Sequence, residues 1–356
     1  MKKFITAAVA LLLAGLACFG GARLLQKPPT PGSKTLVIYN WGDYVAPSLL
    51  KKFERETGYQ VSYQTFDSNE AMLTKIRQGG THFDLAVPSD YTIAKMRQEH
   101  LLKRLDQKKL PNLHYVGKEF LNKSFDPHNN YSVPYFWGTL GIVYNDRFVK
   151  KSQVEHWNDL WNPRLRDSVM LVDSARDILG FAFISQGQSL NTVNPVQLRV
   201  ATAKLNELQP NVKAIVADEI KMYMEQGDAK VAVTWSGEAQ QMIAVNHHLH
   251  YLVPAEGSNL WFDNLVIPKG ARNKKAAYAF INFMLRPENA AVNAAYVGYS
   301  TPVPAAQRLL QKEGRLDRQF YPNSAQLARL QVFKNLSSAQ LQEYNDLFLN
   351  FKMNTR

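Results

Sequence analysis

Two hydrophobic periodicities alternate along the chain, one typical of strands and one typical of helices. The runs "TLVIYN" and "DLAVPS" are continuously apolar, as in buried strands, and "VSYQTF" alternates apolar and polar residues. Between these runs, apolar residues recur at helical spacing, first up to Gly58 and then up to Gly79 and Gly80. This β-α-β-α-β order predicts an α/β fold in which helices flank both faces of a parallel-rich sheet.

A second set of the same kind begins after "GTLGIVYN". Its predicted strands are "SVMLVD", "VKAIVAD", "KVAVTWSG" and "LHYLVPAEG", separated by helical stretches such as "VQLRVATAKLNEL". The later segments "NLVIP" and "KKAAYAFINFMLRP" resemble elements of the first set. We therefore expect two lobes that face a cleft. The first comprises residues 35–138 and 264–307, and the second comprises residues 139–263 and 308–356.

Length and charge agree with this picture and narrow the possible partners. A chain of 356 residues exceeds what one core usually fills, so about two domains are expected. The formal charge is +12, but the basic residues are scattered over helical stretches, and no basic run carries interleaved aromatics. Nucleic acid is therefore not an expected partner. A basic surface in an exported protein suits anionic polymers or lipid headgroups, whereas a cation would need a local acidic site.

The N-terminus predicts export. Lys2 and Lys3 precede an apolar run over residues 4–19, so residues 1–25 are expected to form a signal peptide or membrane anchor. Residues 26–34 form a proline-containing linker. Cys18, the only cysteine, ends "GLAC" and is a candidate for lipidation, although Gly15 stands where such signals usually carry Leu. An incidental cysteine is the alternative. We expect a monomer in the periplasmic space or tethered at the outer face of the cytoplasmic membrane.

One segment after another ends in an aromatic residue or a carboxylate. In open parallel sheets, ligands gather beyond the carboxyl ends of the strands. Each residue taken alone has an ordinary structural role, such as packing at a rim or capping a helix. Their joint occurrence on both predicted lobes favours a shared binding site. The candidate binding residues are Trp41, Asp43, Tyr44, Ser89, Tyr91, Ser174, Asp177, Trp235, Glu238, Trp261, Asp263 and Tyr299.

The stretch "NLWFDNLVIP" indicates the kind of ligand. On a strand, Trp261 and Asp263 point to the same face, which places an aromatic ring beside a carboxylate. An ammonium over a ring gains about 0.5–2 kcal/mol, and a charge-assisted hydrogen bond contributes about 1.5–3 kcal/mol. Binding costs about 4–15 kcal/mol in lost freedom, so several rings and more than one carboxylate are needed. Rings also cover methylene groups, which favours an organic amine over a metal ion.

Several motifs in fixed order carry a family resemblance from about Thr35 through the final third of the chain. They are "YNWGDY", "FDSNEAMLTKIRQG", "DLAVPSDY", "SFDP", "PYFWGTLGIVYN", "LWFDNLVIP", "AFINFMLRPENA" and "VGYSTP". Together they resemble the spermidine/putrescine-binding proteins of bacterial ABC importers. The resemblance implies a two-lobed periplasmic-binding-protein type II fold that holds a polyamine in the interlobe cleft and delivers it to a membrane permease. It implies ligand contacts from Trp41, Tyr44, Ser89, Tyr91, Trp235, Trp261, Asp263 and Tyr299.

The chain also departs from the family pattern. The best-known members carry "DDARE", whereas this chain has "DSARD", which places Ser174 and Asp177 where two acids are usual. Phe333 stands roughly where the family has a contacting glutamine. Glu238 or Asp218 could supply the missing charge. Spermidine and putrescine both remain candidate ligands.

Other functions have weaker support. An amino-acid receptor would need an arginine for the ligand carboxylate, and Arg176 is the candidate. A hydrolase could use Asp173 and Asp177 as an acid/base pair, but the sequence carries no nucleophile elbow, P-loop or dinucleotide fingerprint, so no enzyme and no cofactor are expected. The cluster "NHHLH" lacks an acid or cysteine in the sequence around it, so we expect a polar helix end and no metal site.

Overall fold

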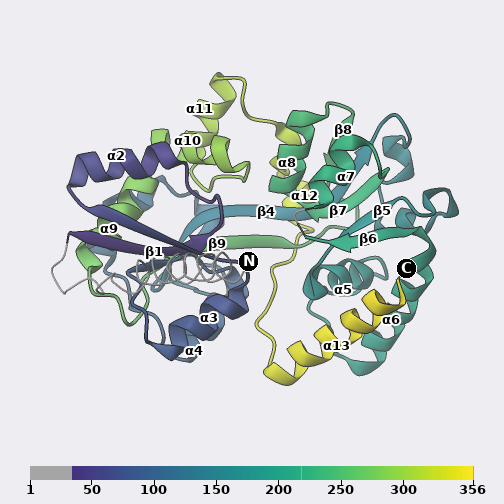
Figure 1. Cartoon of the computed structure of the whole chain (residues 1–356), viewed down its shortest axis with the longest axis horizontal. Coiled ribbons are helices and arrows are strands. Elements are labelled where there is room, and N and C mark those ends of the chain that lie inside the picture. The colour runs from purple at the N-terminus through teal and green to yellow at the C-terminus, as the bar shows by residue number, and fades with distance from the viewer. Residues whose placement is uncertain (1–33, 218, 356) are drawn as a thin grey trace, which may run out of the picture.

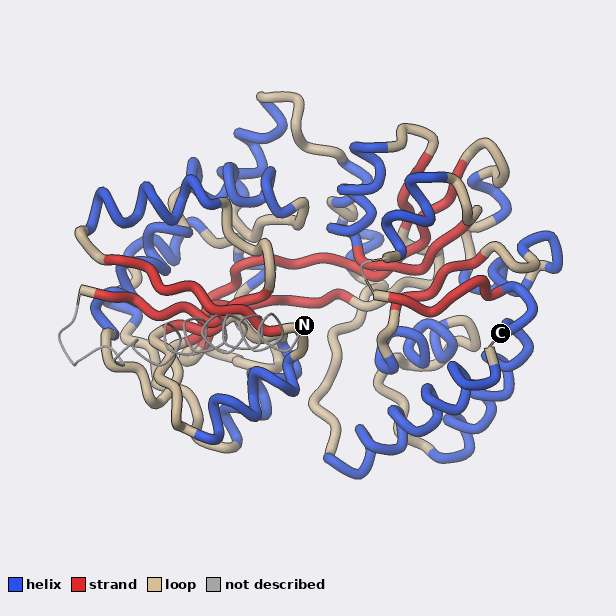
Figure 2. Tube along the Cα trace, viewed as in Figure 1, coloured by secondary structure: helices blue, strands red, loops and turns tan. Residues whose placement is uncertain are grey.

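The structure is a computed structural model that describes residues 34–217 and 219–355. Two α/β lobes lie side by side, and two long strands pass from one lobe into the other (Figure 1). These strands are β4 (Ser132–Asn145) and β9 (Leu260–Val266), which pair antiparallel. Figure 2 shows the strands as one continuous band across both lobes, with helices above and below it.

The first lobe is built on the parallel strands β1 (Thr35–Trp41), β2 (Gln60–Phe66) and β3 (Leu85–Ala86), in the order β2-β1-β3. β9 continues this sheet by pairing antiparallel with β3. Side chains from both faces form one apolar core that also contains Leu260 and Phe262. The helices around this sheet are α2 (Pro47–Thr57), α3 (Asn69–Gln78), α4 (Asp90–Gln98), α9 (Lys274–Met284), α10 (Pro287–Val297) and α11 (Pro304–Lys312).

The second lobe continues the sheet in the order β4-β7-β5-β6, with β8 paired to β4 as well. Its strands are β5 (Val169–Val172), β6 (Val212–Val216), β7 (Val231–Trp235) and β8 (Leu249–Leu252). Its helices are α5 (Ala175–Ile184), α6 (Pro195–Leu208), α7 (Ile220–Gln226), α8 (Ser236–Val245), α12 (Ser324–Leu327) and α13 (Ser338–Asn354). Short 3₁₀ helices lie at Gln107–Lys109, Pro111–Tyr115, Lys118–Phe120, Lys151–Gln153, Trp157–Trp161, Pro163–Leu165, Gln209–Asn211 and Arg318–Phe320.

The sheets are mixed, more so than the sequence pattern suggested. β5 is parallel to β6 and β7, but β4 is antiparallel to β7, β8 and β9. β4 pairs with β9 over Ser132–Thr139 and with β7 from Leu140 onward. β4 is therefore one continuous strand that belongs to both lobes. Its apolar sequence gives no sign of the position at which its pairing partner changes from β9 to β7.

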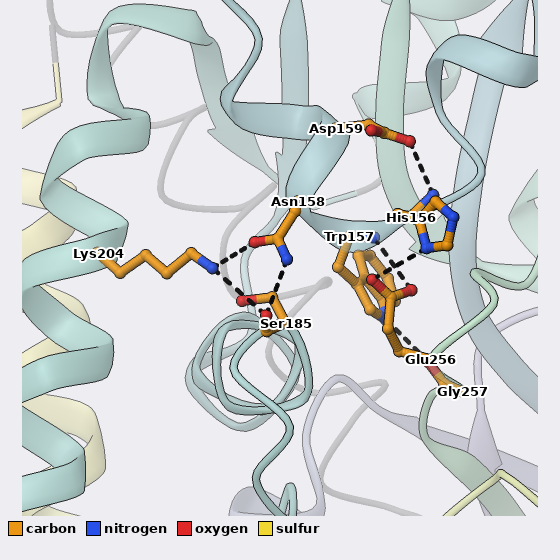
Figure 3. Close-up of polar contacts among 8 residues, drawn as sticks. All are labelled: His156, Trp157, Asn158, Asp159, Ser185, Lys204, Glu256 and Gly257. Atoms are coloured by element: carbon orange, nitrogen blue, oxygen red, sulfur yellow. Dashed lines mark hydrogen bonds and ion pairs between the residues drawn. The ribbon is translucent and has the colours of Figure 1, made fainter.

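The loop that precedes β9 is fastened to the second lobe (Figure 3). The indole of Trp157 donates to the carbonyl of Gly257 in this loop at 2.8 Å. The neighbouring Asn158 is in turn held within the second lobe, because the ammonium of Lys204 donates to Asn158 and to the carbonyl of Ser185. Gly257 has φ +99°, and a Cβ there would lie 2.2 Å from the carbonyl oxygen of Arg329. Only glycine allows this close approach. The residues just before β9 are thereby held in place.

The N-terminal predictions concern residues beyond the described part. The predicted signal or anchor, the linker except for Lys34, Cys18 and Asp218 all lie outside the described residues. Within residues 34–217 and 219–355, no helix is both long and apolar enough to span a membrane.

Candidate functional site

Asp263 lies in the middle of β9, where that strand passes between the lobes. Its side chain is 6% exposed, and both carboxylate oxygens accept hydrogen bonds from hydroxyl groups. Tyr44 donates to Oδ2 at 2.5 Å and Ser89 donates to Oδ1 at 2.6 Å. Tyr44 follows β1 and Ser89 follows β3, so the ends of two parallel strands position the donors. The result is a buried carboxylate with fixed orientation.

Asn69, at the first position of α3, organises the adjoining residues. Its side-chain amide donates to Ser89 Oγ and to the hydroxyl of Tyr91, each at 3.0 Å. Its side-chain carbonyl accepts the backbone N–H of Ser89, also at 3.0 Å. Tyr91 is thus linked to Asp263 through two hydrogen-bonded residues.

Aromatic rings cover the Asp263 region. The ring of Tyr299 packs edge-to-face on Trp261 at 4.9 Å and on Tyr44 at 5.5 Å between centroids. Trp261 can pack closely on β4 because its neighbour on that strand is Gly138, where a Cβ would come within 2.3 Å of the indole ring. These rings supply π-faces and edges beside the carboxylate, the combination expected for binding an organic ammonium.

The second lobe contributes another buried carboxylate, Asp177, in the first turn of α5. Ser174 caps this helix and donates to Asp177 Oδ2 at 2.7 Å. The indole N–H of Trp235 lies 3.3 Å from the same oxygen. The side-chain amide of Asn259, which immediately precedes β9, donates to Oδ1 at 3.3 Å. Asp177 is therefore positioned by the second lobe and by the strand that carries Asp263.

The strand register places the main groups on one face of the sheet. Trp235 lies opposite Leu140, Trp261 opposite Gly138, and Asp263 opposite Phe136. Leu140, Gly138 and Phe136 alternate along β4 and so share a face, and directly opposite residues point the same way. Trp235, Trp261 and Asp263 therefore line a common surface that crosses from the second lobe into the first.

The two lobes touch directly beside this surface. The hydroxyl of Tyr299 donates to Glu238 Oε1 at 3.1 Å, while Lys221 lies 3.4 Å from the other oxygen of the Glu238 carboxylate. A Cβ at Gly237 would lie only 1.7 Å from the Tyr299 ring. Glycine at this position permits the close contact between α8 and the Tyr299 loop.

Asp43 and Trp41 have local structural roles at the end of β1. Asp43 is exposed, with a left-handed backbone conformation (φ 46°) that turns the chain after β1. Trp41 packs its ring on Phe66 at 4.5 Å. A positive φ at an aspartate is set by the local turn and leaves no trace in the hydrophobic periodicity. The sequence therefore grouped Asp43 with the candidate binding residues around it, although Asp43 is exposed.

Sequence reasoning missed three buried polar residues at the site. Two of them are Asn69 and Asn259, whose side chains hydrogen-bond to Ser89 and Tyr91 and to Asp177, respectively. Asp90, next to Ser89, is fully buried, and its carboxylate accepts the backbone N–H groups of Tyr91 at 2.6 Å and Phe262 at 3.2 Å. A polar residue beside a strand end is the signal that could have indicated each of them.

Burial raises the pKa of all three acids at the site. Desolvation raises the pKa of Asp263 to about 6, although the hydrogen bonds from Ser89 and Tyr44 oppose this. Desolvation likewise raises the pKa of Asp177, against the bonds from Ser174, Asn259 and Trp235. It raises the pKa of Asp90 to about 8. A bound cation would favour the ionised forms of Asp263 and Asp177.

The ligand-free protein is expected to lose stability as pH rises from 6 to 8. The folded-state pKa of Asp90, about 8, exceeds its unfolded value of 3.8, so the folded protein holds the extra proton across this range and raising the pH removes that advantage. Thermal unfolding followed against pH should show Tm falling, and the slope should be smaller in Asp90→Asn. Asp228→Asn, at an exposed aspartate, should keep the wild-type slope. An unchanged slope in Asp90→Asn would contradict the assignment.

The residues considered for a hydrolase or for an amino-acid receptor make other contacts in the structure. Asp173, one of the two acids considered for a hydrolase, is exposed and pairs with Lys352 at 2.5 Å, whereas Asp177 is buried. The Arg176 guanidinium stacks on the Phe333 ring at 4.3 Å and donates to the carbonyl of Lys334 at 3.2 Å. These contacts give Arg176 a structural role.

The histidine cluster follows the end of α8, and the fold brings an acid to it that the local sequence lacks. His248 and His250 lie at the turn into β8 and on β8, and both contact Asp146, at 2.9 and 2.8 Å. The acid comes from about a hundred residues earlier, so the local sequence could not show it. Among the described residues, no group of three or more His, Cys, Asp or Glu is arranged to hold a metal ion.

Comparisons with known proteins agree with this fold. The family model of bacterial extracellular solute-binding proteins matches residues 48–315. A spermidine/putrescine-binding periplasmic protein of Salmonella typhimurium is 38% identical over 322 residues, which cover 90% of this chain and 91% of that protein. The spermidine/putrescine ABC transporter substrate-binding protein PotD of Streptococcus pneumoniae has a similar structure, with 55% identity, a TM-score of 0.84, and coverage of 91% of this chain and 100% of that chain. The Tp0655 lipoprotein of Treponema pallidum superimposes with a TM-score of 0.80 at 29% identity, covering 90% of this chain and 99% of that chain.

Proposed function

The chain belongs to the family of bacterial extracellular solute-binding proteins, and on this premise we propose that it is a polyamine receptor of an ABC importer. It binds spermidine and/or putrescine between the lobes and delivers the ligand, chemically unchanged, to a membrane permease. Relatives that carry spermidine/putrescine-binding names match nearly the whole chain, which supports this assignment.

The observation that carries the proposal is the surface formed by Trp235, Trp261 and Asp263. It combines the buried carboxylate of Asp263 on β9 with aromatic rings, and Asp177 adds a second buried carboxylate from α5 of the second lobe. Each terminal ammonium group of a polyamine can pair with one of these carboxylates, and the methylene groups between the amines can lie against the indole rings. A charge-assisted hydrogen bond contributes about 1.5–3 kcal/mol, so two of them with ring contacts can offset the cost of association.

We further propose that the lobes close around the ligand by bending at β4 and β9. The predicted lobe boundaries, at 138/139 and 263/264, fall inside these two strands. The Tyr299–Glu238 contact and the close approach at Gly237 support closure as the state described here. The protein acts as a monomer, exported and tethered through its N-terminal segment.

Isothermal titration with spermidine, putrescine and cadaverine tests the proposal. At least one of them should bind with micromolar or tighter affinity, because two carboxylates and several rings contribute together. Glutamate serves as the control for the amino-acid alternative and should give no heat. Heat with glutamate alone, or no heat with any of the three amines at micromolar protein, would contradict the assignment.

A further inference from the structure

We propose that the outer end of lobe 1 is a binding surface for the anionic headgroups of a lipid bilayer. The surface comprises Lys34 and the segments 103–109 and 269–275, and we call it the basic end. The inference goes beyond the receptor function and rests on it only for export and for attachment through the N-terminal segment. It concerns part of the formal charge of +12, which the binding of a cationic ligand does not explain.

Both segments of the basic end are rich in lysine and arginine. Residues 269–275 contain four basic residues and no acid, and residues 103–109 contain four basic residues and one acid. Apart from the half-buried Lys103, all of these basic side chains are exposed. The one acid, Asp106, lies 3.3 Å from Lys109 and is therefore already paired. The two segments together carry a clear excess of positive charge.

Backbone contacts hold the two segments side by side. The backbone N–H groups of Lys103 and Lys269 each donate to a carbonyl of the facing chain, at 2.8 and 2.7 Å. At the other end of the pair, the side-chain amide of Asn282 on α9 donates to the carbonyl of Lys109 at 2.7 Å. The charges of both segments therefore belong to one surface of the folded protein, although they are more than 150 residues apart in the sequence.

The N-terminal segment joins the molecule at the basic end. Lys34 is exposed and directly precedes β1, and the next carbonyl, that of Thr35, accepts a hydrogen bond from the side-chain amide of Asn273 at 3.0 Å. Residues 1–33, which are expected to export and attach the protein, therefore connect beside segment 269–275. Attachment through them brings this end of lobe 1 close to the bilayer, which favours lipid headgroups as the anionic partner.

The ligand site lies at the opposite end of the same sheet. β1 runs from Thr35, at the basic end, toward Tyr44, which contacts Asp263. Seven residues of strand, with a rise of about 3.3 Å each, separate the two ends by about 20 Å. Figure 1 shows α9, which begins at Lys274, on the side of lobe 1 that faces away from lobe 2. A bilayer at the basic end therefore leaves the polyamine site accessible.

Neighbouring acids do not cancel the positive charge of the basic end. At the end of α2, Glu56 lies 2.6 Å from Arg286, and Glu54 accepts the backbone N–H of Val61 at 2.8 Å. A lysine or arginine near an anionic membrane contributes about fivefold to affinity. A bilayer presents many headgroups in one plane, so several of these side chains can contribute together.

Lysine acetylation of the full chain on vesicles tests the proposal directly. The vesicles contain phosphatidylcholine alone or phosphatidylcholine with about one third phosphatidylglycerol. Labelling of Lys269, Lys274 and Lys275 should fall at least about fivefold on the anionic vesicles relative to the neutral ones, and labelling of the exposed Lys150 and Lys151 of lobe 2 should not change. About 1 M salt should remove the protection, because it shortens the Debye length to about 3 Å.

Two results of this labelling would overturn the proposal. One is equal labelling of the basic end on both kinds of vesicle. The other is protection by soluble polyglycerol phosphate without protection by anionic vesicles, which would assign the surface to an anionic polymer.

Two matched double variants give a second test. Lys274→Glu/Lys275→Glu and Lys150→Glu/Lys151→Glu change the net charge equally, and acids in the first turn of α9 favour the helix, so the first pair should fold. The ratio of partition onto anionic over neutral vesicles should fall at least about 25-fold in the first pair and less than about threefold in the second. Thermal unfolding checks that both pairs are folded.

Putrescine titration of the same proteins separates this proposal from the receptor function. Both double variants should bind putrescine as the wild type does, because the basic end lies away from the ligand site. An unchanged partition ratio in Lys274→Glu/Lys275→Glu, or an equal fall in both pairs, would overturn the proposal and leave the receptor function intact. Failure of the wild type to bind any polyamine would overturn only the receptor function.

Discussion

Asp263→Asn is expected to lower polyamine affinity by about 100-fold or more while the protein stays folded. The substitution keeps the size and the hydrogen-bonding oxygen but removes the charge opposite a desolvated ammonium. Breaking one partner of a buried ion pair costs about 3–5 kcal/mol, and about 2.7 kcal/mol already corresponds to 100-fold. Isothermal titration of the variant with its best amine ligand measures the loss directly.

The pH dependence gives this variant a second readout. Because the pKa of Asp263 is about 6 in the ligand-free protein, protons compete with the amine below that pH, and wild-type affinity should rise between pH 5 and pH 7.5. Asp263→Asn has no such carboxylate and should show a much flatter profile. Asp228→Asn removes one exposed negative charge and should bind as the wild type does. If Asp263→Asn bound within threefold of the wild type, Asp263 would not contact the ligand.

The sequence predicted local elements well because each rests on local physics. The strand ending at Trp41 and the helix stopped by Gly58 follow from apolar periodicity and from one residue that tolerates positive φ, here 71°. Ser89 and Ser174 follow β3 and β5, as the strand-end rule predicts. The order of elements alone was enough to predict that these two residues follow strand ends.

The rule that ligands gather beyond strand ends does not explain the position of Asp263. This residue lies inside β9, an antiparallel strand that crosses between the lobes, and not at the end of a parallel strand. The links from Asp177 to Asn259 and from Asp263 to Tyr44 join residues 82 and 219 positions apart. Such links depend on strand order and register, which local patterns do not encode. The exposure of Asp43 and the burial of Asp90 are further outcomes of tertiary packing.

Gly237→Ala is expected to weaken polyamine binding without lowering the stability of the folded protein. The added Cβ would lie 1.7 Å from the Tyr299 ring, which cannot easily retreat because it is wedged against Trp261 and Tyr44. The lobes would then be held apart, and a ligand bound on one lobe would lose the carboxylate of the other. We expect about a 100-fold loss of affinity, since an ion-pair contribution of this size is about 3 kcal/mol.

Folding should be unaffected or slightly improved by the same substitution. Gly237 lies in the first turn of α8, and alanine in place of glycine favours a helix by up to about 1 kcal/mol. Small-angle scattering should show that added putrescine compacts the wild type but not Gly237→Ala. Gly80→Ala is the matched control, because nothing lies within 4 Å of a Cβ at that position. Wild-type affinity and compaction in Gly237→Ala would mean that binding does not require the lobe contact at Tyr299.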